Sequence, residues 1–144
     1  MAAPLTSTRL RVRGYHLDGY GHVNNARYLE FLEEGRWAYF DERPEVARWF
    51  APGEVALVAV NLNIDYRRAA VAGDDLEVQT VLATLGGRSA RMRQRILRRG
   101  DDEVVVDATL TFVLLDVASQ QALPIEGALR EALAPLVVDL DTLA

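Results

Sequence analysis

Apolar and polar residues alternate with a period of two along much of the chain. The clearest stretch is 55–66, where Val58, Val60, Leu62 and Ile64 fall on one face and Ala59, Asn61, Asn63 and Asp65 on the other. This period is typical of a β-strand with one polar face. The same reasoning predicts strands at residues 9–13, 76–85, 89–99 and 104–115, with glycine-containing hairpin turns at 85–88 and 99–102.

Residues 25–40 show a different period, in which apolar side chains recur every three to four residues. This pattern predicts one long amphipathic helix, whose apolar side carries Tyr28, Phe31, Leu32, Gly35, Ala38 and Tyr39. Asn24 is a suitable N-cap for it. Gly35 costs about 1 kcal/mol of helix propensity relative to Ala, so its place in the apolar stripe indicates close packing against a sheet.

Residues 41–53 are predicted to form a loop, because they contain Pro44, Pro52 and Gly53. We expect a short helical turn near 45–49, and the loop either covers one end of an apolar pocket or simply caps the core. A short C-terminal helix is predicted at 126–134. One early helix followed by antiparallel strands predicts an α+β fold, a curved sheet wrapped around a single helix, in one domain spanning 1–144.

Composition narrows the chemistry. The 144 residues are 50% hydrophobic and 26% charged, which is ordinary for a globular domain. Cysteine and lysine are both absent, so disulfides, thiolate nucleophiles and Schiff-base catalysis are excluded. The net charge of −5 argues against a nucleic-acid partner. Without a long apolar run or a secretory layout we expect no membrane span and a cytoplasmic location.

A polar, glycine-rich turn lies just before the long helix. Asp18 and His22 occupy this turn, which leads into the N-terminus of the helix, where free N–H groups and the helix dipole favour negative charge. Such a site suits an oxyanion. From spacing alone, Asp18 is better explained as an ordinary turn or capping residue. Two histidines six residues apart, without cysteine, match no metal-binding pattern, so we expect neither a metal nor a cofactor.

The run 18–25 is the most specific motif, with the sequence Asp-Gly-Tyr-Gly-His-Val-Asn-Asn, followed by Ala-Arg-Tyr-Leu-Glu-Phe at 26–31 and Glu-Gly-Arg at 34–36. It resembles the signature of hotdog-fold acyl-CoA thioesterases, in particular the 4-hydroxybenzoyl-CoA thioesterase-like group. Weaker similarities at 65–68, 73–76 and 87–89 extend the resemblance over residues 8–125. Two positions depart from it: many relatives have a second aspartate where this chain has His16, and plant acyl-ACP thioesterases have asparagine where it has Tyr20.

The resemblance implies a hotdog fold and roles for residues of the motif. Asp18 would attack the thioester carbonyl or activate water, and the backbone N–H of Asn25 would polarise the thioester oxygen. Close relatives have apolar residues at the position of His22, so the resemblance assigns it no role; it would either act as a second polarising group or hold the turn by bonding backbone carbonyls. The expected catalytic residues are thus Asp18, His22 and Asn25, and the expected substrate-binding residues are Asn24, Tyr28, Val60, Asn61, Arg67, Arg88 and Ser89.

Two groups of side chains have a simple structural interpretation beside a functional one. Arg91, Arg93 and Arg95, with Arg88, Arg98 and Arg99 at the hairpin ends, are typical of a solvated strand face. Some of them, with Arg67 and Arg68, are alternatively suited to the phosphates of CoA. The aromatic residues Trp37, Tyr39, Trp49, Phe50 and Phe112 could line an acyl pocket, although core packing is the simpler interpretation.

The leading functional interpretation is a hydrolase that cleaves an acyl-CoA to a free acid and CoA. One alternative is a non-catalytic acyl-CoA-binding domain, a sensor or scaffold, which has no need of an ionised Asp18. Another is a hydratase or dehydratase on the same fold, which the close spacing of Asp18 and His22 fits less well. Because one helix leaves part of a small sheet uncovered, we expect a homodimer or homotetramer with sites at the subunit boundary.

Overall fold

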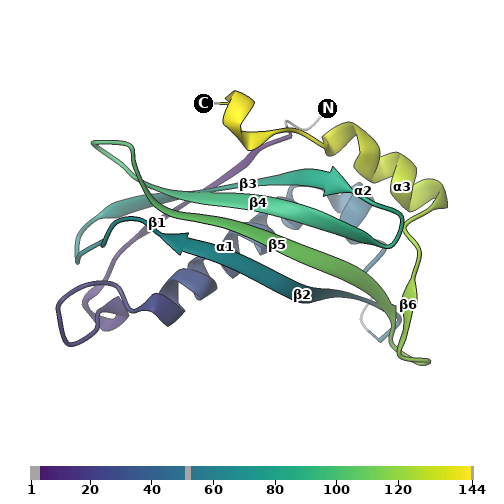
Figure 1. The fold of residues 1–144 in the computed structure, drawn as a ribbon, viewed down its shortest axis with the longest axis horizontal. Coiled ribbons are helices and arrows are strands. Elements are labelled where there is room, and N and C mark those ends of the chain that lie inside the picture. The colour runs from purple at the N-terminus through teal and green to yellow at the C-terminus, as the bar shows by residue number, and fades with distance from the viewer. Residues whose placement is uncertain (1–3, 51–52, 144) are drawn as a thin grey trace.

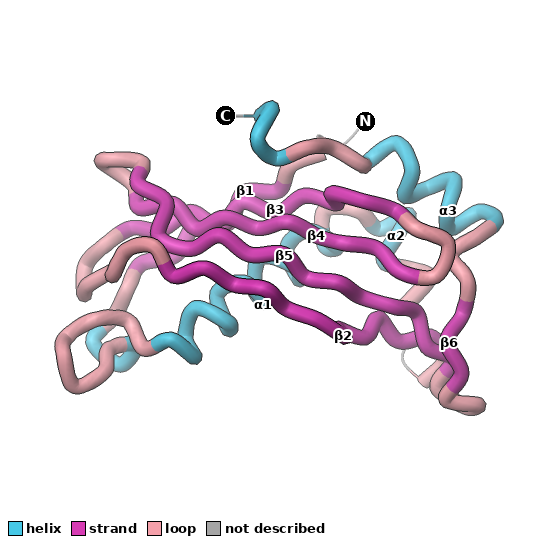
Figure 2. Tube along the Cα trace, in the orientation of Figure 1, coloured by secondary structure: helices cyan, strands magenta, loops and turns pink. Residues whose placement is uncertain are grey.

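The computed structural model describes residues 4–50 and 53–143, in which a curved antiparallel sheet lies against one long helix (Figure 1). The helix α1 (Asn25–Asp41) runs across one face of the sheet, and Figure 2 shows the same two layers coloured by type. The shorter helices α2 and α3 span Pro44–Ala47 and Gly127–Leu133. This arrangement confirms the predicted α+β architecture.

The sheet has the strand order β1-β3-β4-β5-β2, and the short β6 pairs with β5. The strands span Thr6–Arg11 (β1), Val55–Tyr66 (β2), Asp75–Leu85 (β3), Ser89–Arg98 (β4), Glu103–Asp116 (β5) and Gln121–Leu123 (β6). The strands and hairpins predicted from alternation are therefore confirmed, as are the long helix, the helical turn and the C-terminal helix. Sequence did not predict β6 or the 3-10 helices at Gly14–His16, Ala134–Leu136 and Leu140–Leu143. Pro52, part of the predicted loop, lies outside the described residues.

Strand β2 departs from the predicted alternation at a β-bulge between Ala59 and Asn61. A bulge inserts one residue and so reverses the faces on its far side. Val58 shares a face with Val113, whereas Leu62 lies opposite the buried Leu110. The prediction that Val58 and Leu62 lie on one face is therefore wrong.

The same strand forms an edge of the sheet and is largely open to solvent. All five residues from 59 to 63 are exposed, with Val60 at 56% and Leu62 at 37% of full exposure. A long edge strand with exposed apolar side chains is a ready template for pairing with another chain.

The helix packs on the sheet most closely at Gly35, next to a buried polar contact. Gln94 of β4 is 1% exposed, and its Nε2 donates to the carbonyl oxygen of Leu32 at 2.8 Å and to Oγ1 of Thr80 at 2.9 Å. A Cβ atom on Gly35 would lie only 3.0 Å from the same Nε2. The close packing expected at Gly35 is thus confirmed.

Core packing explains some of the aromatic residues but not all of them. Tyr39 and Phe112 are buried, and Trp49 and Phe50 pack against the same apolar cluster. Trp37 is 61% exposed, so the interpretation of its side chain as core is wrong. At 100° per residue, position 37 lies on the side of the helix opposite the apolar stripe, so the ring projects away from the core.

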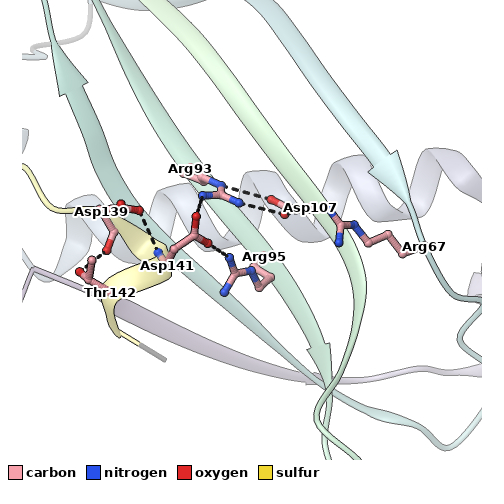
Figure 3. A network of polar contacts seen from close by, with 7 residues as sticks. All are labelled: Arg67, Arg93, Arg95, Asp107, Asp139, Asp141 and Thr142. Carbon is pink, nitrogen blue, oxygen red and sulfur yellow. Dashed lines mark hydrogen bonds and ion pairs between the residues drawn. The ribbon is translucent and has the colours of Figure 1, made fainter.

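Several arginines of the sheet are engaged in ion pairs on the face opposite α1 (Figure 3). Arg93 donates to Asp107 with Nη2 at 3.0 Å and to Asp141 with Nη1 at 2.9 Å, and Arg95 also pairs with Asp141. The side chains of Arg93 and Arg95 are only 24% and 15% exposed, so the interpretation of a freely solvated face is wrong for these two. Their contacts tie the C-terminal segment to the sheet.

Candidate active site

The turn that carries Asp18 is closed by its own backbone. Leu17 and Val23 form an antiparallel bridge, and the N–H of Asp18 donates to the carbonyl oxygen of His22 at 2.8 Å. The N–H of Gly21 donates back to the carbonyl oxygen of Asp18 at 3.1 Å, and Gly21 has φ +78°, a conformation that glycine adopts without strain. The sequence thus forms a tight loop directly before α1.

The Asp18 carboxylate is held by one of its two oxygens. Oδ1 accepts from the N–H of Tyr20 at 2.8 Å and from the N–H of His22 at 3.3 Å. Within the described part of the chain, Oδ2 accepts no hydrogen bond. One oxygen fixes the orientation of the carboxylate, and the other is available to a substrate or a water molecule.

The N-terminus of α1 begins beside this carboxylate. Asn24 is the N-cap, as predicted, and its Oδ1 accepts from the N–H of Ala26 at 2.9 Å. The cap is anchored because the N–H of Asn24 donates to the carbonyl oxygen of His16 at 2.9 Å. Among residues 4–50 and 53–143, nothing accepts from the N–H of Asn25, so this donor and the helix dipole are free to act on a bound anion or carbonyl oxygen.

A cavity of ≈ 310 Å³ joins these groups. Its walls bring together five of the predicted residues: Asp18, His22 and Asn25 before and at the start of α1, Tyr28 of α1, and Arg67 from the segment after β2. The buried Tyr28 accepts from the N–H of Ala70 at 3.1 Å through its hydroxyl oxygen, and burial raises the pKa of Tyr28. The hydroxyl therefore stays protonated and can donate its own hydrogen.

Tyr66 also lines this cavity, and sequence reasoning missed it. Its hydroxyl donates to the carbonyl oxygen of Asn25 at 3.3 Å, and its ring lies 5.7 Å from that of Tyr28. The available signal was its position as the last residue of the predicted strand 55–66, directly before Arg67 and Arg68.

The two histidines differ in their surroundings. His22 is exposed and shapes the turn through its backbone N–H and carbonyl oxygen. His16 accepts from the N–H of Arg13 at 2.9 Å through Nδ1 and lies edge-on to Phe31 at 5.0 Å. Burial, assisted by the positive charge of Arg27, lowers the pKa of His16. The residue at the position of the second aspartate of many relatives is thus a neutral packing group.

Five of the predicted substrate-binding residues do not line this cavity: the N-cap Asn24, which lies next to it in sequence, and four residues farther away. Arg88 and Ser89 belong to the hairpin between β3 and β4, at the end of the sheet next to α3, whereas the turn before α1 lies at the opposite end (Figure 1). Val60 and Asn61 lie in the middle of the exposed edge strand β2. Within one protomer, the structure therefore does not bring these four residues to Asp18.

A second, larger cavity of ≈ 510 Å³ lies farther along α1 and β2. Trp37, Phe40 and Phe50 form one part of its lining, and Leu57 and Ala59 of β2 form another. In the described ranges there is no cluster of three or more side chains suited to a metal ion. The described helices also include none with the length and apolar character needed to span a membrane.

Comparison with known proteins identifies the family. The profile described as the thioesterase-like superfamily matches residues 12–133. The chain belongs to the thioesterase-like superfamily. This membership confirms the thioesterase class inferred from the motif at 18–25, and the structural similarities below confirm its hotdog fold.

Individual thioesterases are similar to this chain over nearly their whole length. The chain is 48% identical over 130 residues to the long-chain acyl-CoA thioesterase FadM of Escherichia coli strain K12, covering 90% of this chain and 98% of FadM. The crystal structure of YbaW, a probable thioesterase from Escherichia coli, has a TM-score of 0.78 at 45% identity and covers 92% of this chain and 98% of that chain. Slr0204, a 1,4-dihydroxy-2-naphthoyl-CoA thioesterase from Synechocystis, shares the fold with a TM-score of 0.77 at 19% identity, covering 95% and 98%.

Proposed function

We propose that this protein hydrolyses long-chain acyl-CoA thioesters to the free acid and CoA. The observation that carries the proposal is the free Oδ2 of Asp18 beside the unpaired N–H of Asn25, in one cavity at the start of α1. The similarity to FadM, whose name specifies long-chain acyl-CoA, supports the substrate class.

In the proposed reaction, the thioester carbonyl oxygen accepts a hydrogen bond from the Asn25 N–H. This donor stabilises the negative charge that develops on the oxygen as the carbonyl carbon is attacked. Asp18 either attacks the carbon itself, giving an anhydride that water then hydrolyses, or removes a proton from the attacking water. On both routes the C–S bond breaks, the thiolate of CoA leaves and takes up a proton, and the acyl group gains one oxygen from water.

The remaining predicted residues take binding roles in this proposal. Asn24 caps the helix that supplies the oxyanion donor, and Tyr28, which lines the cavity, binds the substrate with its hydroxyl group. Arg67 and Arg68 at its rim are suited to the phosphates of CoA. His22 keeps the turn in shape through its backbone.

Assembly completes the proposal. We infer a homodimer or a homotetramer in which the open edge of β2 meets a second copy of the chain, so that Val60, Asn61, Arg88 and Ser89 act on a site shared between subunits. The exposed apolar residues of β2 support this arrangement.

The test uses the absence of cysteine, because a thiol reagent mixed with protein and acyl-CoA then reports only the CoA thiol released. A panel from acetyl-CoA to palmitoyl-CoA, with aromatic acyl-CoAs, measures the chain preference. Asp18→Asn keeps the shape of the turn but removes the charge, so kcat should fall by about 10²–10⁴ while binding persists. The matched control is Asp102→Asn in the β4–β5 turn, which should keep the wild-type rate.

Two results would overturn the proposal. Wild-type protein that binds an acyl-CoA but releases no thiol from any of them is a binding domain. An Asp18→Asn variant that hydrolyses at the wild-type rate removes the carboxylate from the mechanism.

A further inference from the structure

The two cavities described above both lie along the boundary between α1 and β2. At one end, Asn25 and Tyr66 line the smaller cavity, and at the other end Trp37 and Leu57 line the larger one. Between these ends, Leu29 of α1 is 39% exposed, and Leu62, on the side of β2 that faces the helix layer, is 37% exposed, so both elements offer apolar surface there. An acyl chain that starts at the Asn25 N–H can therefore follow this boundary into the larger cavity.

Arg36 is an unusual member of the lining of the larger cavity. Its Nη1 donates to Oε1 of Gln94 at 3.0 Å, and Gln94 is itself fully buried and fixed by two further hydrogen bonds. The guanidinium is therefore held in one orientation by the core of the protein. In the part of the chain that the structure describes, the guanidinium makes no ion pair with a carboxylate. Burial lowers the pKa of Arg36, and the nearby negative charge of Glu33 offsets this effect only in part.

The chemistry around Arg36 distinguishes between possible partners. A guanidinium has five N–H donors and no acceptor, so its remaining donors need an oxygen acceptor on the bound molecule. The rest of the cavity lining is largely aromatic and aliphatic. Glu33 and Asp41 also line the cavity, and their negative charges disfavour a carboxylate as the occupant. A neutral hydroxyl satisfies both kinds of group, because it accepts from Arg36 and donates to Glu33.

We propose that Arg36 and Glu33 recognise a hydroxyl group on the far part of a long acyl chain, making hydroxylated long-chain acyl-CoAs preferred substrates. The inference rests on the proposed thioesterase function and deepens it. Arg36 lies eleven positions after Asn25 on the helix, a rise of about 16.5 Å at 1.5 Å per residue. Only a long chain spans that length, so the hydroxyl must lie near its distal end.

The experiment compares two pairs of substrates. Palmitoyl-CoA and ω-hydroxypalmitoyl-CoA form the long pair, and octanoyl-CoA and ω-hydroxyoctanoyl-CoA form a short pair whose hydroxyl does not reach Arg36. We expect kcat/KM of the wild-type enzyme to favour the hydroxylated member of the long pair. Arg36→Met, which keeps the bulk but removes the donors, should reduce that ratio by roughly tenfold to a hundredfold, the size expected for hydrogen bonds to charged groups. The ratio for the short pair should stay unchanged.

Glu33→Gln is a second, independent test of hydroxyl recognition. Glu33 is exposed, so its substitution should not impair folding. It replaces the charged acceptor by an amide and should reduce the same ratio in the same direction. Equal ratios in the wild type and in both variants would overturn the proposal while leaving the thioesterase function intact. An equal loss of kcat/KM for all four substrates, with altered subunit dissociation in sedimentation, would assign Arg36 to a subunit contact instead. If the wild-type enzyme hydrolyses none of the four substrates, the proposed thioesterase function is wrong, and with it this inference.

Discussion

A Cβ atom on Gly35 would lie 2.6 Å from Cγ1 of Val78, a distance that real side chains essentially never show. Gly35 is in the middle of α1 and Val78 in the middle of β3, so this contact sets the spacing between the helix and the sheet. The same closeness lets Gln94 reach the carbonyl oxygen of Leu32 and hold Arg36. One glycine therefore influences the packing of the core and the lining of the larger cavity together.

Gly35→Ala should destabilise the protein even though alanine is the better helix former. The gain in helix propensity is about 1 kcal/mol, whereas overpacking a dense core costs about 1–3 kcal/mol. The free energy of unfolding, measured by urea titration, should fall. The matched control is Gly87→Ala in the β3–β4 hairpin, where a Cβ meets nothing within 4 Å. A Gly35→Ala variant as stable as the wild type would show that the sheet can shift to admit a methyl group.

The close packing at Gly35 could be predicted from the sequence. A glycine lowers helix propensity, so its presence within the apolar stripe indicates that a larger side chain would not fit there. The bulge in β2 could not be predicted, since the apolar–polar alternation continues through Val60 while the pairing with β5 changes faces. Alternation reports the period of a strand and says nothing about its partner strand. Three-residue elements such as β6 carry too few positions to show any period.

The candidate site was partly predictable for a similar reason. Asp18, His22 and Asn25 are close in sequence, so one motif contains them, and the structure places them in one cavity. Tyr66 reaches that cavity only through the return of β2 to the helix N-terminus, which local spacing does not reveal. Arg67 is expected from the sequence to bind substrate, but its position in the sequence does not place it beside Asp18. Arg88 resembles a phosphate-binding residue in sequence, yet its hairpin lies at the other end of the protomer (Figure 1).

His16 should make the stability of the protein depend on pH in the mildly acidic range. Its folded pKa lies below the ordinary value of 6.5, so the unfolded chain binds the proton more readily. Stability should therefore be fully present above pH 6.5 and should fall as the pH drops toward the folded pKa. His16→Gln, compared with His22→Gln at the exposed histidine, should flatten this dependence in thermal denaturation. An identical pH profile for wild type and His16→Gln would contradict this prediction.

Arg67→Ala and Arg88→Ala should separate the contributions of the two ends of the protomer to CoA binding. Each is expected to raise KM for acyl-CoA and leave kcat nearly unchanged, because a phosphate contact stabilises the ground state and the transition state alike. The Arg67 side chain is 54% exposed, so the increase should be modest, roughly threefold to tenfold at low salt, and should shrink as salt is added. An unchanged KM for Arg88→Ala would leave Arg88 as a surface residue of the hairpin and confine the phosphate contacts to the Asp18 end.

Asp141→Asn should loosen the C-terminal segment. Hydrogen bonds from Arg93 and Arg95 lower the pKa of the Asp141 carboxyl, so its contribution to stability is present above the ordinary value of 3.8 and is lost as the pH falls through the folded pKa. Hydrogen exchange of the Leu140–Leu143 helix should therefore accelerate in the variant at neutral pH. Asp139→Asn, two residues away and without an arginine partner in the described structure, is the matched control.

Val60→Glu should break the proposed assembly and, with it, the activity. Val60 is 56% exposed on an edge strand of 12 residues, and pairing of this edge with a second chain would bury it. A carboxylate buried there without a partner is strongly unfavourable, so light scattering should show the mass falling from at least twice 16.0 kDa toward that of one chain. Thiol release should fall in parallel, because the proposed site takes residues from both subunits. Val137→Glu, at a 40% exposed valine beside β3, should leave both mass and activity unchanged. A wild-type protein that is a monomer at micromolar concentration contradicts the shared site, and Val60 and Asn61 then have no route to the Asp18 cavity.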